Sequence, residues 1–498
     1  MEWREVVVGH DYRGQPYTMG YFHLEEVLAS MRTQPSLRDH WRTRSQPVHR
    51  TVQEPPCGKG PMGCHKHRGR SATKRVYHHP MDCRIGEDAE RRMQAAGHTI
   101  ADPRNVPVVL MTGEDKAKMT QFGGTFYPVH LRPGNLDYTV WTSEKACHLW
   151  ALLPVYRANP KEAGKQTGFG DLQRLERLEL HAACIAYLTK QLEVAALLGV
   201  RILEDGEHLC TLYPHAWGHA DDRAETQMDT GTSCTYTVQC GCANCLVPRD
   251  RWAEVPDRDQ GYAYWDTQTR YRAQHLQLAD REIVLGDDNK TAGQYCTGAL
   301  PMDAADPRVL RAEYDSYPPD SFHRDSNTKG YLINETLERL AKEGGTSTSY
   351  LQLEERFAAA PREKQEVLKH FWGGVGKVTN ASHDELNGIW QQLLVYACLL
   401  VSGEDWQALL TWALATSKLD GGGPVSDWDF EEFYLLLRKC RKALRLSSYA
   451  RATRVAEHKK TENVPWHDVV HVPRGIMWWG TRFSTAFFEQ AHEFILKR

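Results

Sequence analysis

The chain has 498 residues, of which 41% are hydrophobic and 25% charged, proportions typical of a globular protein with a large buried core. Its formal net charge of −3 excludes a uniformly basic protein that binds nucleic acid over its whole surface, so any such site has to be local. Thirteen cysteines, an odd number spread over a long chain, argue against a secreted disulfide-linked fold and favour a reducing compartment, the cytosol or the nucleus.

Residues 1–104 show no sustained hydrophobic period and are predicted to be irregular. From Arg42 to Arg75 the sequence holds nine Lys or Arg residues and one acid, a composition that predicts a flexible basic arm. Cysteines and histidines also gather here, but their spacings match no standard zinc finger, so a solvated basic loop is favoured over a zinc site. These residues are Cys57, Cys64, His65, His67, His78, His79 and Cys83.

Residues 105–222 predict an α/β core. Extended stretches at 106–111, 125–133 and 148–157 precede a long helix at 171–198, and a further strand at 208–217 follows it. The helix has leucine and isoleucine at every third or fourth position, and Gly199 marks its end. Three strands, a helix and a strand predict a sheet covered by helices.

Two carboxylates follow strands of this core. Asp115 comes after the first strand, and Asp222 comes after the strand that follows the long helix. If these strands are neighbours in one sheet, the two acids lie close together. Acids paired in this way, with a third from elsewhere, hold two Mg²⁺ or Mn²⁺ ions about 3.5–4 Å apart for phosphoryl transfer. The alternative, acids that only carry strand ends into water, stays open on spacing alone.

A cysteine-rich segment follows at 234–245. Cys242 and Cys245 form a C-x-x-C pair with Cys240 just upstream, which is half of a structural zinc site. The second pair of ligands is not evident, and His275 and Cys296 are candidates. Structural zinc and unliganded cysteines both remain open, whereas a redox pair is disfavoured because no strand-to-helix turn accompanies it.

The remainder of the chain is predicted to be mostly helical, with helices at 404–417 and 427–446, the second capped by Ser426 or Asp427. The longest apolar run, at 393–401, is too short to span a membrane, and the N-terminus has no secretory signal. His181 on the long helix is expected to be a core residue rather than a ligand. Glu489 and His492 share one face of a last helix.

Several segments together resemble one protein family. The stretch "VPVVLMTGEDKAKMTQFGGTFYPVHLRPGNL" is similar to the opening of the catalytic domain of Plavaka-type transposases. In that family a strand ends in an Asp-Lys pair, followed by Thr-x-Phe, a Tyr/Trp-Pro-Val strand and a Gly-Asn turn. The matching positions are Asp115, Lys116, Thr120, Phe122, Pro128, Val129, Gly134 and Asn135.

Further segments match in the same order from about residue 76 to the end. "LELHAAC" resembles the family's Leu-Phe-His-Asp-Cys helix, and "LYPHAWGHADDRAE" resembles its Tyr-Pro…Ala-Asp-Tyr-Pro-Glu segment. "CGCANCLVP" is similar to Cys-Pro-x-Cys-Leu-Val-Pro, and "LKHFWGGVGKVTN" to a His-Phe-x-Gly-Gly-Ile-Ser stretch. "STAFFEQAHEFILK" is similar to a Thr-Glu-x-x-Glu-Arg-Leu-His helix.

The resemblance implies a CACTA-like DDE transposase in the nucleus, a metal-dependent enzyme that cleaves DNA and joins strands. Its fold class would be α/β, an RNase H-like mixed sheet with flanking helices interrupted by a large helical insertion. Asp115, Asp222 and Glu489 would bind Mg²⁺ or Mn²⁺, with His181 and His492 as further candidates. Double-stranded DNA at transposon ends would be the partner of a homo-oligomer, with no membrane. The basic residues expected to contact DNA are Lys116, Lys66, Arg68, Arg70, Lys74 and Arg75.

This interpretation divides the chain into four parts: an irregular basic region at 1–104, the first part of the core with the cysteines at 105–250, the insertion at 251–465, and the last core helix at 466–498. Near the third acid the sequence departs from the family, with Trp478, Trp479, Thr481 and Gln490 at altered positions. A truncated or decayed copy is therefore one expectation. Three alternatives stay open: a domesticated DNA-binding protein without catalysis, an RNase H-like nuclease, and a zinc-organised helical interaction protein.

Overall fold

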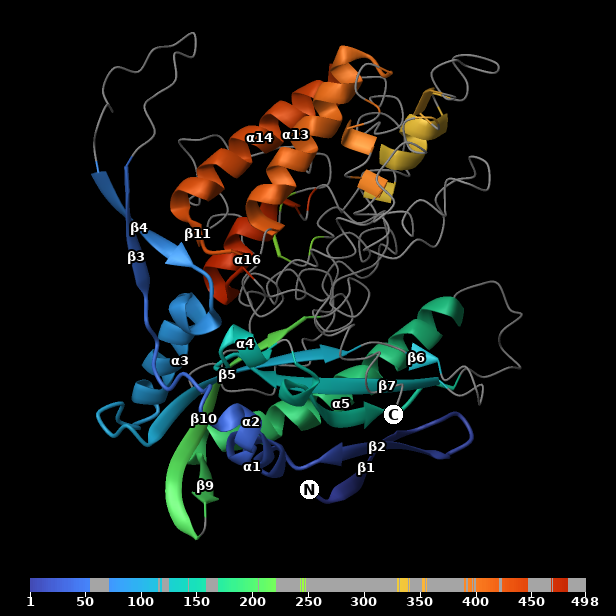
Figure 1. Cartoon of the computed structure of the whole chain (residues 1–498). Coiled ribbons are helices and arrows are strands. Elements are labelled where there is room, and N and C mark those ends of the chain that lie inside the picture. The colour runs from blue at the N-terminus through green and yellow to red at the C-terminus, as the bar shows by residue number, and fades with distance from the viewer. Residues whose placement is uncertain are drawn as a thin grey trace.

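The structure of the protein is a computed structural model (Figure 1). It describes residues 1–53, 71–114, 117–118, 125–141, 143–157, 169–204 and 206–220, parts of 242–247, 329–355 and 389–400, and residues 400–420, 423–446, 467 and 469–481.

A mixed sheet of eight strands organises the first half of the described chain. Seven of them follow the order β1-β2-β8-β7-β5-β10-β9, and β6 pairs with β7. Their bounds are β1 (Trp3–His10), β2 (Pro16–Phe22), β5 (Asn105–Glu114), β6 (Ala117–Lys118), β7 (Thr125–Pro133), β8 (His148–Leu153), β9 (Val200–Glu204) and β10 (Glu207–His219).

The two central strands, β5 and β10, are parallel neighbours. The register pairs Val109 with Ala216 and Thr112 with His219, after one irregularity between Tyr213 and Ala216. Every residue of β5 from Val106 to Glu114 is buried, so both faces of the strand are covered. This explains why its sequence is a continuous apolar run instead of an alternating one.

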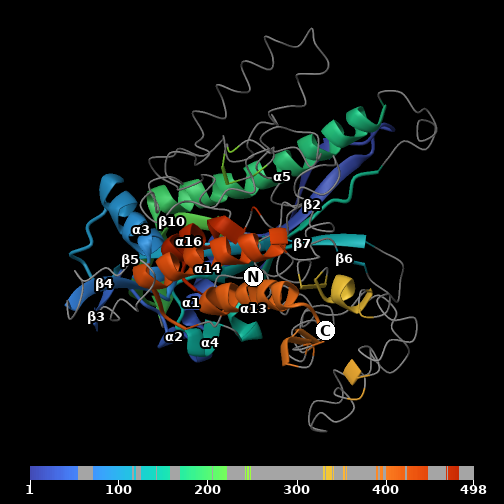
Figure 2. The same cartoon turned by 90° about the horizontal axis from the view of Figure 1, so that it is seen from above.

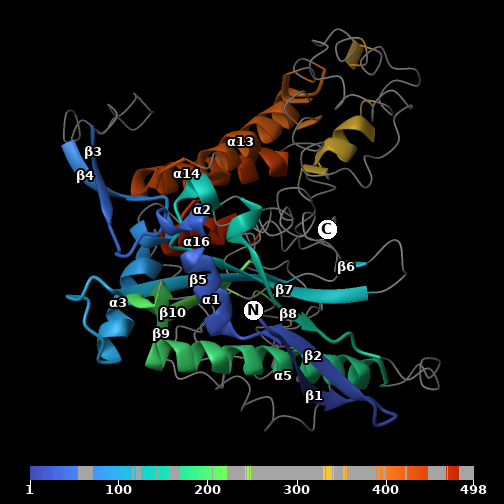
Figure 3. The same cartoon turned by 60° about the horizontal axis from the view of Figure 1, so that its bottom comes forward.

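Helices cover both sides of the sheet. α5 (Phe169–Leu198) lies along one face of the sheet. α13 (Gly403–Asp420), α14 (Asp427–Leu446) and α16 (Val472–Trp479) lie on the opposite side (Figures 1 and 3). Figure 2 shows α14 and α16 above the sheet from a third direction. α5 buries one stripe of residues against the sheet at helical spacing: Cys184, Ile185, Leu188, Leu192 and Ala195.

Shorter elements complete the sheet layer. They are α1 (Leu24–Thr33), α2 (Pro35–Arg38), α3 (Arg84–Ala95), α4 (Tyr138–Trp141) and the 3₁₀ turns η2 (Pro80–Asp82) and η3 (Glu144–Ala146). α3 packs against β5 and β10. A separate small sheet joins β3 (Val48–Gln53), β4 (Ser71–Tyr77) and β11 (Val425–Ser426).

A second hydrophobic core belongs to the helical part of the chain. α13 (Gly403–Asp420) and α14 (Asp427–Leu446) pack on each other around Trp412, Phe430 and Leu437. Ser426 precedes α14, and the carboxylate of Asp429 accepts bonds from its backbone N–H at 2.8 Å and its hydroxyl at 2.7 Å. These contacts cap the helix, as the sequence predicted at this position. Both predicted helices, 404–417 and 427–446, are confirmed.

The predicted α/β core is confirmed in its order of elements: β5, β7, β8, α5 and β10 lie where the sequence pattern placed three strands, a helix and a strand. The third strand ends at Leu153, earlier than predicted, and β9 was not predicted. β9 is the last strand of the sheet, and β8 ends where its pairing with β7 ends, so pairing with a neighbour decides both differences.

The prediction that residues 1–104 are irregular is wrong for the part that the structure describes. β1 and β2 extend the main sheet, α1 and α3 pack into its core, and β3 pairs with β4 where a flexible arm was expected. The pattern failed because no residue of β1, an edge strand, is fully buried, and because its partner β2 joins the main sheet through β8, which lies far along the chain. The division of the chain into four parts stays a prediction.

Candidate functional site

The edge of the main sheet is the first candidate site. β5 ends at Glu114 and its parallel neighbour β10 ends at His219, and the Ala220 N–H donates to the Thr112 carbonyl at 2.8 Å. The two segments that carry Asp115 and Asp222 therefore leave the sheet at the same edge. Asp115, Lys116 and Asp222 lie outside the described residues, so the positions of their side chains stay predictions.

A buried polar pair lies beneath this edge. Glu114 Oε1 is 3.1 Å from Nε2 of His181 on α5, with both side chains almost fully buried. The Tyr127 ring lies beside His181 at 5.9 Å, and Glu114 adds to the effect of burial that raises the pKa of the Cys184 thiol to about 12. His181 is a core residue, as expected, and its partner is the last residue of β5.

Three more side chains of the same edge are joined by hydrogen bonds. Thr112 Oγ1 accepts from the Trp217 indole N–H at 3.0 Å and lies 3.0 Å from Nδ1 of His219. All three residues are buried. Hydrogen bonds across β5 and β10 thus fix their relative register at the end where the predicted acids follow.

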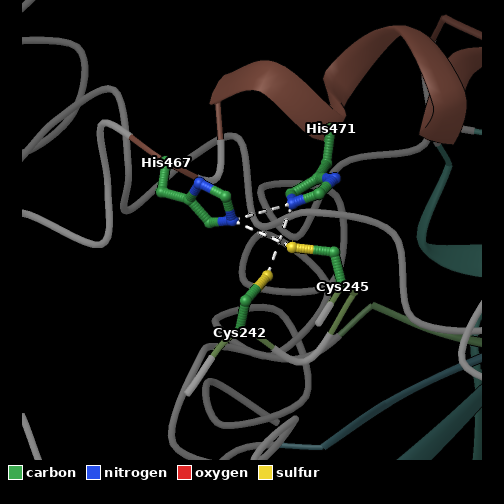
Figure 4. A group of neighbouring side chains, drawn as sticks. All are labelled: Cys242, Cys245, His467 and His471. Carbon is green, nitrogen blue, oxygen red and sulfur yellow. Dashed lines mark hydrogen bonds between the residues drawn. The ribbon is translucent and has the colours of Figure 1, made fainter. Parts of the chain in front are cut away.

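The second candidate site is a cluster of four buried side chains from two distant segments. Figure 4 shows Cys242, Cys245, His467 and His471 pointing toward one another. All four potential ligand atoms lie within 4.8 Å of one another. It is the one group of this kind among the described residues.

The distances within the cluster fit a tetrahedral zinc ion. Sγ of Cys242 is 3.4 Å from Nε2 of His471, Sγ of Cys245 is 3.1 Å from Nε2 of His467, and the two Nε2 atoms are 3.2 Å apart. Zinc bonded to sulfur and nitrogen at its usual lengths separates neighbouring ligand atoms by about 3.3–3.8 Å. Two thiols and two imidazoles are also the donor set of structural zinc sites.

The electrostatics of the cluster favour deprotonated ligands. Burial by itself raises the pKa of the Cys242 thiol, but Cys245 and the two histidines together hold this pKa well below its ordinary value. Burial lowers the pKa of His467. A thiolate beside a neutral imidazole is the protonation state that binds zinc.

The sequence pattern identified only half of this cluster. Cys242 and Cys245 were predicted ligands, whereas the third predicted cysteine, Cys240, and the candidates His275 and Cys296 lie outside the described residues. The missed ligands are His467 and His471, which stand four apart in "HDVVH". The C-x₂-C and H-x₃-H spacings were detectable, but 222 residues separate Cys245 from His467, and no local pattern joins them.

α16 lies between the histidines and the segment that carries the predicted third acid. Trp479 is fully buried and packs on Gly218 of β10, where a Cβ would lie 2.3 Å from its ring. Gly480 follows with φ +92°, and the Thr481 N–H donates to the His78 carbonyl at 3.1 Å. The chain thus leaves α16 next to the end of β10. Glu489, Gln490 and His492 lie outside the described residues.

Of the predicted DNA-contacting residues, Lys66, Arg68 and Arg70 lie outside the described part, and Lys74 and Arg75 lie on β4. Arg75 contacts the protein itself: its guanidinium bonds Glu87 at 2.9 Å and the Asp82 carbonyl at 3.1 Å.

The described members of the N-terminal Cys/His group have structural roles. His79 is fully buried, receives the Met81 N–H at 3.0 Å and lies 2.8 Å from the Leu136 carbonyl, while burial raises the pKa of the Cys83 thiol. Cys57, Cys64, His65 and His67 lie outside the described residues.

The comparisons with known proteins give one result. The family model of the Plavaka transposase matches residues 61–284, and no curated protein matches the sequence. In the part of the chain that the structure describes, no helix has the length and apolar character of a membrane span. The matched range begins before β4, includes all strands from β5 to β10 and reaches past Cys242 and Cys245. Over residues 61–284 this chain is therefore similar to the Plavaka transposase family.

Proposed function

We propose that this protein is a DDE-type DNA transposase that cleaves DNA and transfers strands with the help of Mg²⁺ or Mn²⁺. The observation that carries the proposal is the parallel pairing of β5 with β10, because the predicted acids Asp115 and Asp222 directly follow the two strand ends. The family match and the mixed sheet with α5 on one face support an RNase H-like core.

In this proposal three carboxylates, Asp115, Asp222 and Glu489, hold the metal. Oxygen donors of this kind suit Mg²⁺ and Mn²⁺. When bound, the two ions stabilise the attacking and leaving oxygens at phosphorus. Trp479 against Gly218 supports the third position, since it holds the end of α16, which precedes Glu489 in the sequence, against β10.

Buried residues beneath the ends of β5 and β10 would support the proposed metal site. The Glu114–His181 pair and the bonds of Thr112 with Trp217 and His219 fill the space beneath the strand ends with bonded polar groups. A rigid support of this kind keeps carboxylates in place when the substrate binds. The proposed site of action is the nucleus, with a homo-oligomer on the DNA.

A structural zinc ion is the second part of the proposal. Cys242, Cys245, His467 and His471 would hold it, and their distances, burial and donor types support it. The zinc would join the segment after Asp222 to the segment before Glu489 and so close the helical insertion at its base.

The test of catalysis uses the full chain with zinc, a supercoiled plasmid and Mn²⁺ or Mg²⁺. Asp115→Asn and Asp222→Asn should each lower nicking and strand transfer more than about a hundredfold, because each removes a metal-binding carboxylate. Asp221→Asn is the matched control, since it makes the same carboxylate-to-amide change at the neighbouring acid. Unchanged nicking in both variants would refute the assignment.

A second outcome separates the main alternative. Wild-type protein that binds DNA but neither nicks nor joins it under these conditions would favour the domesticated, non-catalytic descendant. Gln490 after Glu489 is the sequence feature that supports this alternative. Nicking without joining would favour the RNase H-like nuclease.

A further inference from the structure

The pair β3 and β4 forms a ribbon that extends away from the main sheet (Figures 1 and 3). The two strands are antiparallel over six residue pairs, from Val48 with Val76 to Gln53 with Ser71. β11 joins them only at Val76 and Tyr77. Beyond this end the ribbon consists of two strands, described as residues 48–53 and 71–75.

The outer strand of the ribbon, β3, is exposed where its side chains are described. Val48, His49, Arg50 and Thr51 are consecutive and all exposed, although their side chains alternate between the two faces, and Thr73 on β4 is exposed as well. A two-stranded ribbon with no covered face has little stability of its own in water. Such a ribbon is suited to the binding of a partner and contributes little to a core.

The charges on the ribbon have one sign. Its described residues include Arg50, Lys74, Arg75 and His49 and no acid. Arg50 stands directly opposite Lys74 in the register, so the two side chains share a face with Cβ atoms about 4.5–5.5 Å apart. Like charges in this arrangement destabilise a sheet. Neither side chain forms an ion pair with any residue that the structure describes.

The opposite face shows a different arrangement. Arg75 lies there and is held by Glu87, by the Asp82 carbonyl and by the Tyr77 ring at 5.4 Å. Among the residues that the structure describes, the protein therefore neutralises the cation near the base of the ribbon and offers no counter-charge to the Arg50–Lys74 pair. The face that carries Arg50 and Lys74 is therefore the candidate binding surface of the ribbon.

We propose that the β3–β4 ribbon is a DNA-binding arm whose Arg50–Lys74 pair contacts the phosphates of duplex DNA. This inference rests on the proposed function, for which it names the contact surface. A polyanion supplies the two negative charges that the pair lacks, and a two-stranded ribbon fits the major groove, about 12 Å wide. The binding is non-specific in sequence, because phosphate contacts fix position and do not read bases.

The test measures binding of the full, zinc-loaded chain to a fluorescein-labelled duplex of random sequence at several salt concentrations. Arg50→Thr combined with Lys74→Thr should weaken binding about 10- to 100-fold near physiological salt and lower the salt slope by about two. Threonine keeps the strand because it has high β-propensity. The midpoint of thermal unfolding should stay or rise, since a repulsive pair is removed.

Arg201→Thr combined with Lys145→Thr is the matched control. Both residues are exposed and lie elsewhere, on β9 and in η3, so the change in net charge is identical. An equal loss of affinity in this control would overturn the inference, because net charge would then explain it. Unchanged affinity and slope in the ribbon variant would also overturn it and leave the proposed function intact.

Two other outcomes are informative. A wild-type chain that binds no duplex DNA would refute the proposed function together with the ribbon. If the ribbon variant loses binding to poly-glutamate but keeps binding to DNA, the partner is an acidic protein and the DNA inference is wrong.

Discussion

Asn135 belongs to the Gly-Asn turn of the segment that resembles the Plavaka-type transposases, and its side chain has a structural role in the fold. Its Oδ1 accepts the Val109 N–H at 2.9 Å, and its Nδ2 donates to the carbonyls of Arg42 at 2.8 Å and Pro107 at 2.9 Å. The side chain is fully buried, so it replaces a missing strand partner beside β5. The Gly-Asn turn of the motif is therefore structural here, because two of the three bonds hold the central strand and the third joins the turn to the backbone of Arg42.

Glu114 was one of two acids at the end of the first strand, and the structure gives it a partner. Because β5 places it on the face covered by α5, it meets His181 at 3.1 Å. Spacing along the chain could not distinguish an acid that turns inward from one that turns to water. The face of the strand decides it, and successive residues of a strand point to opposite faces.

His79 makes the stability of the protein depend on pH. Burial lowers its pKa to about 4 from an ordinary value of 6.5, so the unfolded chain takes up this proton first as the pH falls. The contribution of neutral His79 to the free energy of unfolding is thus fully present above pH 6.5 and is lost as the pH falls from 6.5 to 4. A difference of about 2.5 pKa units corresponds to about 3 kcal/mol.

Urea unfolding at pH 7 and at pH 4 checks this expectation. The wild type should lose about 3 kcal/mol more than His79→Gln between the two pH values, since glutamine carries no titrating group. The zinc ligands titrate in both proteins, and their contribution cancels in the comparison. Equal losses would contradict the assignment to His79.

At the scale of elements, α16 is held by a close fit to β10. The Trp479 ring occupies the space that a side chain at position 218 would need. The aromatic residues before the third acid, a departure from the family pattern, therefore have a packing role. They attach the segment after the zinc site to the strand that precedes Asp222.

A double-mutant cycle tests this contact. Gly218→Ala should lower the free energy of unfolding by about 1–3 kcal/mol, because its Cβ collides with the ring. In a Trp479→Leu background the same change should cost much less, which gives a coupling energy of at least about 1 kcal/mol.

Gly403→Ala is the control for this cycle, because nothing lies within 4 Å of a Cβ at that position. Its effect should be within about 0.5 kcal/mol in either background. Additive effects of the changes at positions 218 and 479 would show that the two residues do not interact.

At the scale of the whole molecule, the Cys/His cluster of the proposed zinc site lies in the second of two hydrophobic cores. α16, which begins directly after His471, reaches both cores, with Trp479 in the first and Ile476 in the second. One core lies within the sheet layer and the other around α13 and α14, and Cys242 and Cys245 belong to the second. The cluster connects parts of the chain that are 222 residues apart at Cys245 and His467. A cross-link that closes so long a loop restricts the unfolded chain strongly.

Removal of the proposed zinc should therefore destabilise the second core. His471→Ala, or treatment of the wild type with a chelator, should abolish zinc binding and lower the stability of the helical part by about 5 kcal/mol or more. Calorimetry should then show two unfolding transitions where the zinc-loaded chain shows one. Metal analysis and Co²⁺ absorption spectra measure the site directly.

Cys440→Ser serves as control, because this buried thiol lies in the same helical core and bonds the Ala408 carbonyl at 3.7 Å. It should lower stability but keep the zinc. Full zinc content in His471→Ala would refute the four-ligand site.

Much of the fold follows from local pattern. The continuous apolar run of β5, the leucine spacing of α5 and the cap at Ser426 are properties of neighbouring residues, so the sequence predicts them directly. β1 was missed because an edge strand leaves no buried face to detect. His467 and His471 were missed because their partners are remote, although their own spacing is regular.

The sequence by itself determined the order of β5, β7, β8, α5 and β10, the two candidate acids at strand ends and the first pair of candidate zinc ligands. These depend on hydrophobic period and on short spacings, which the chain carries locally. Only the tertiary structure decided that β5 and β10 are parallel neighbours, that Glu114 meets His181, and that Cys242 and Cys245 meet His467 and His471. Those contacts join residues far apart along the chain, and burial of two separate cores brings them together.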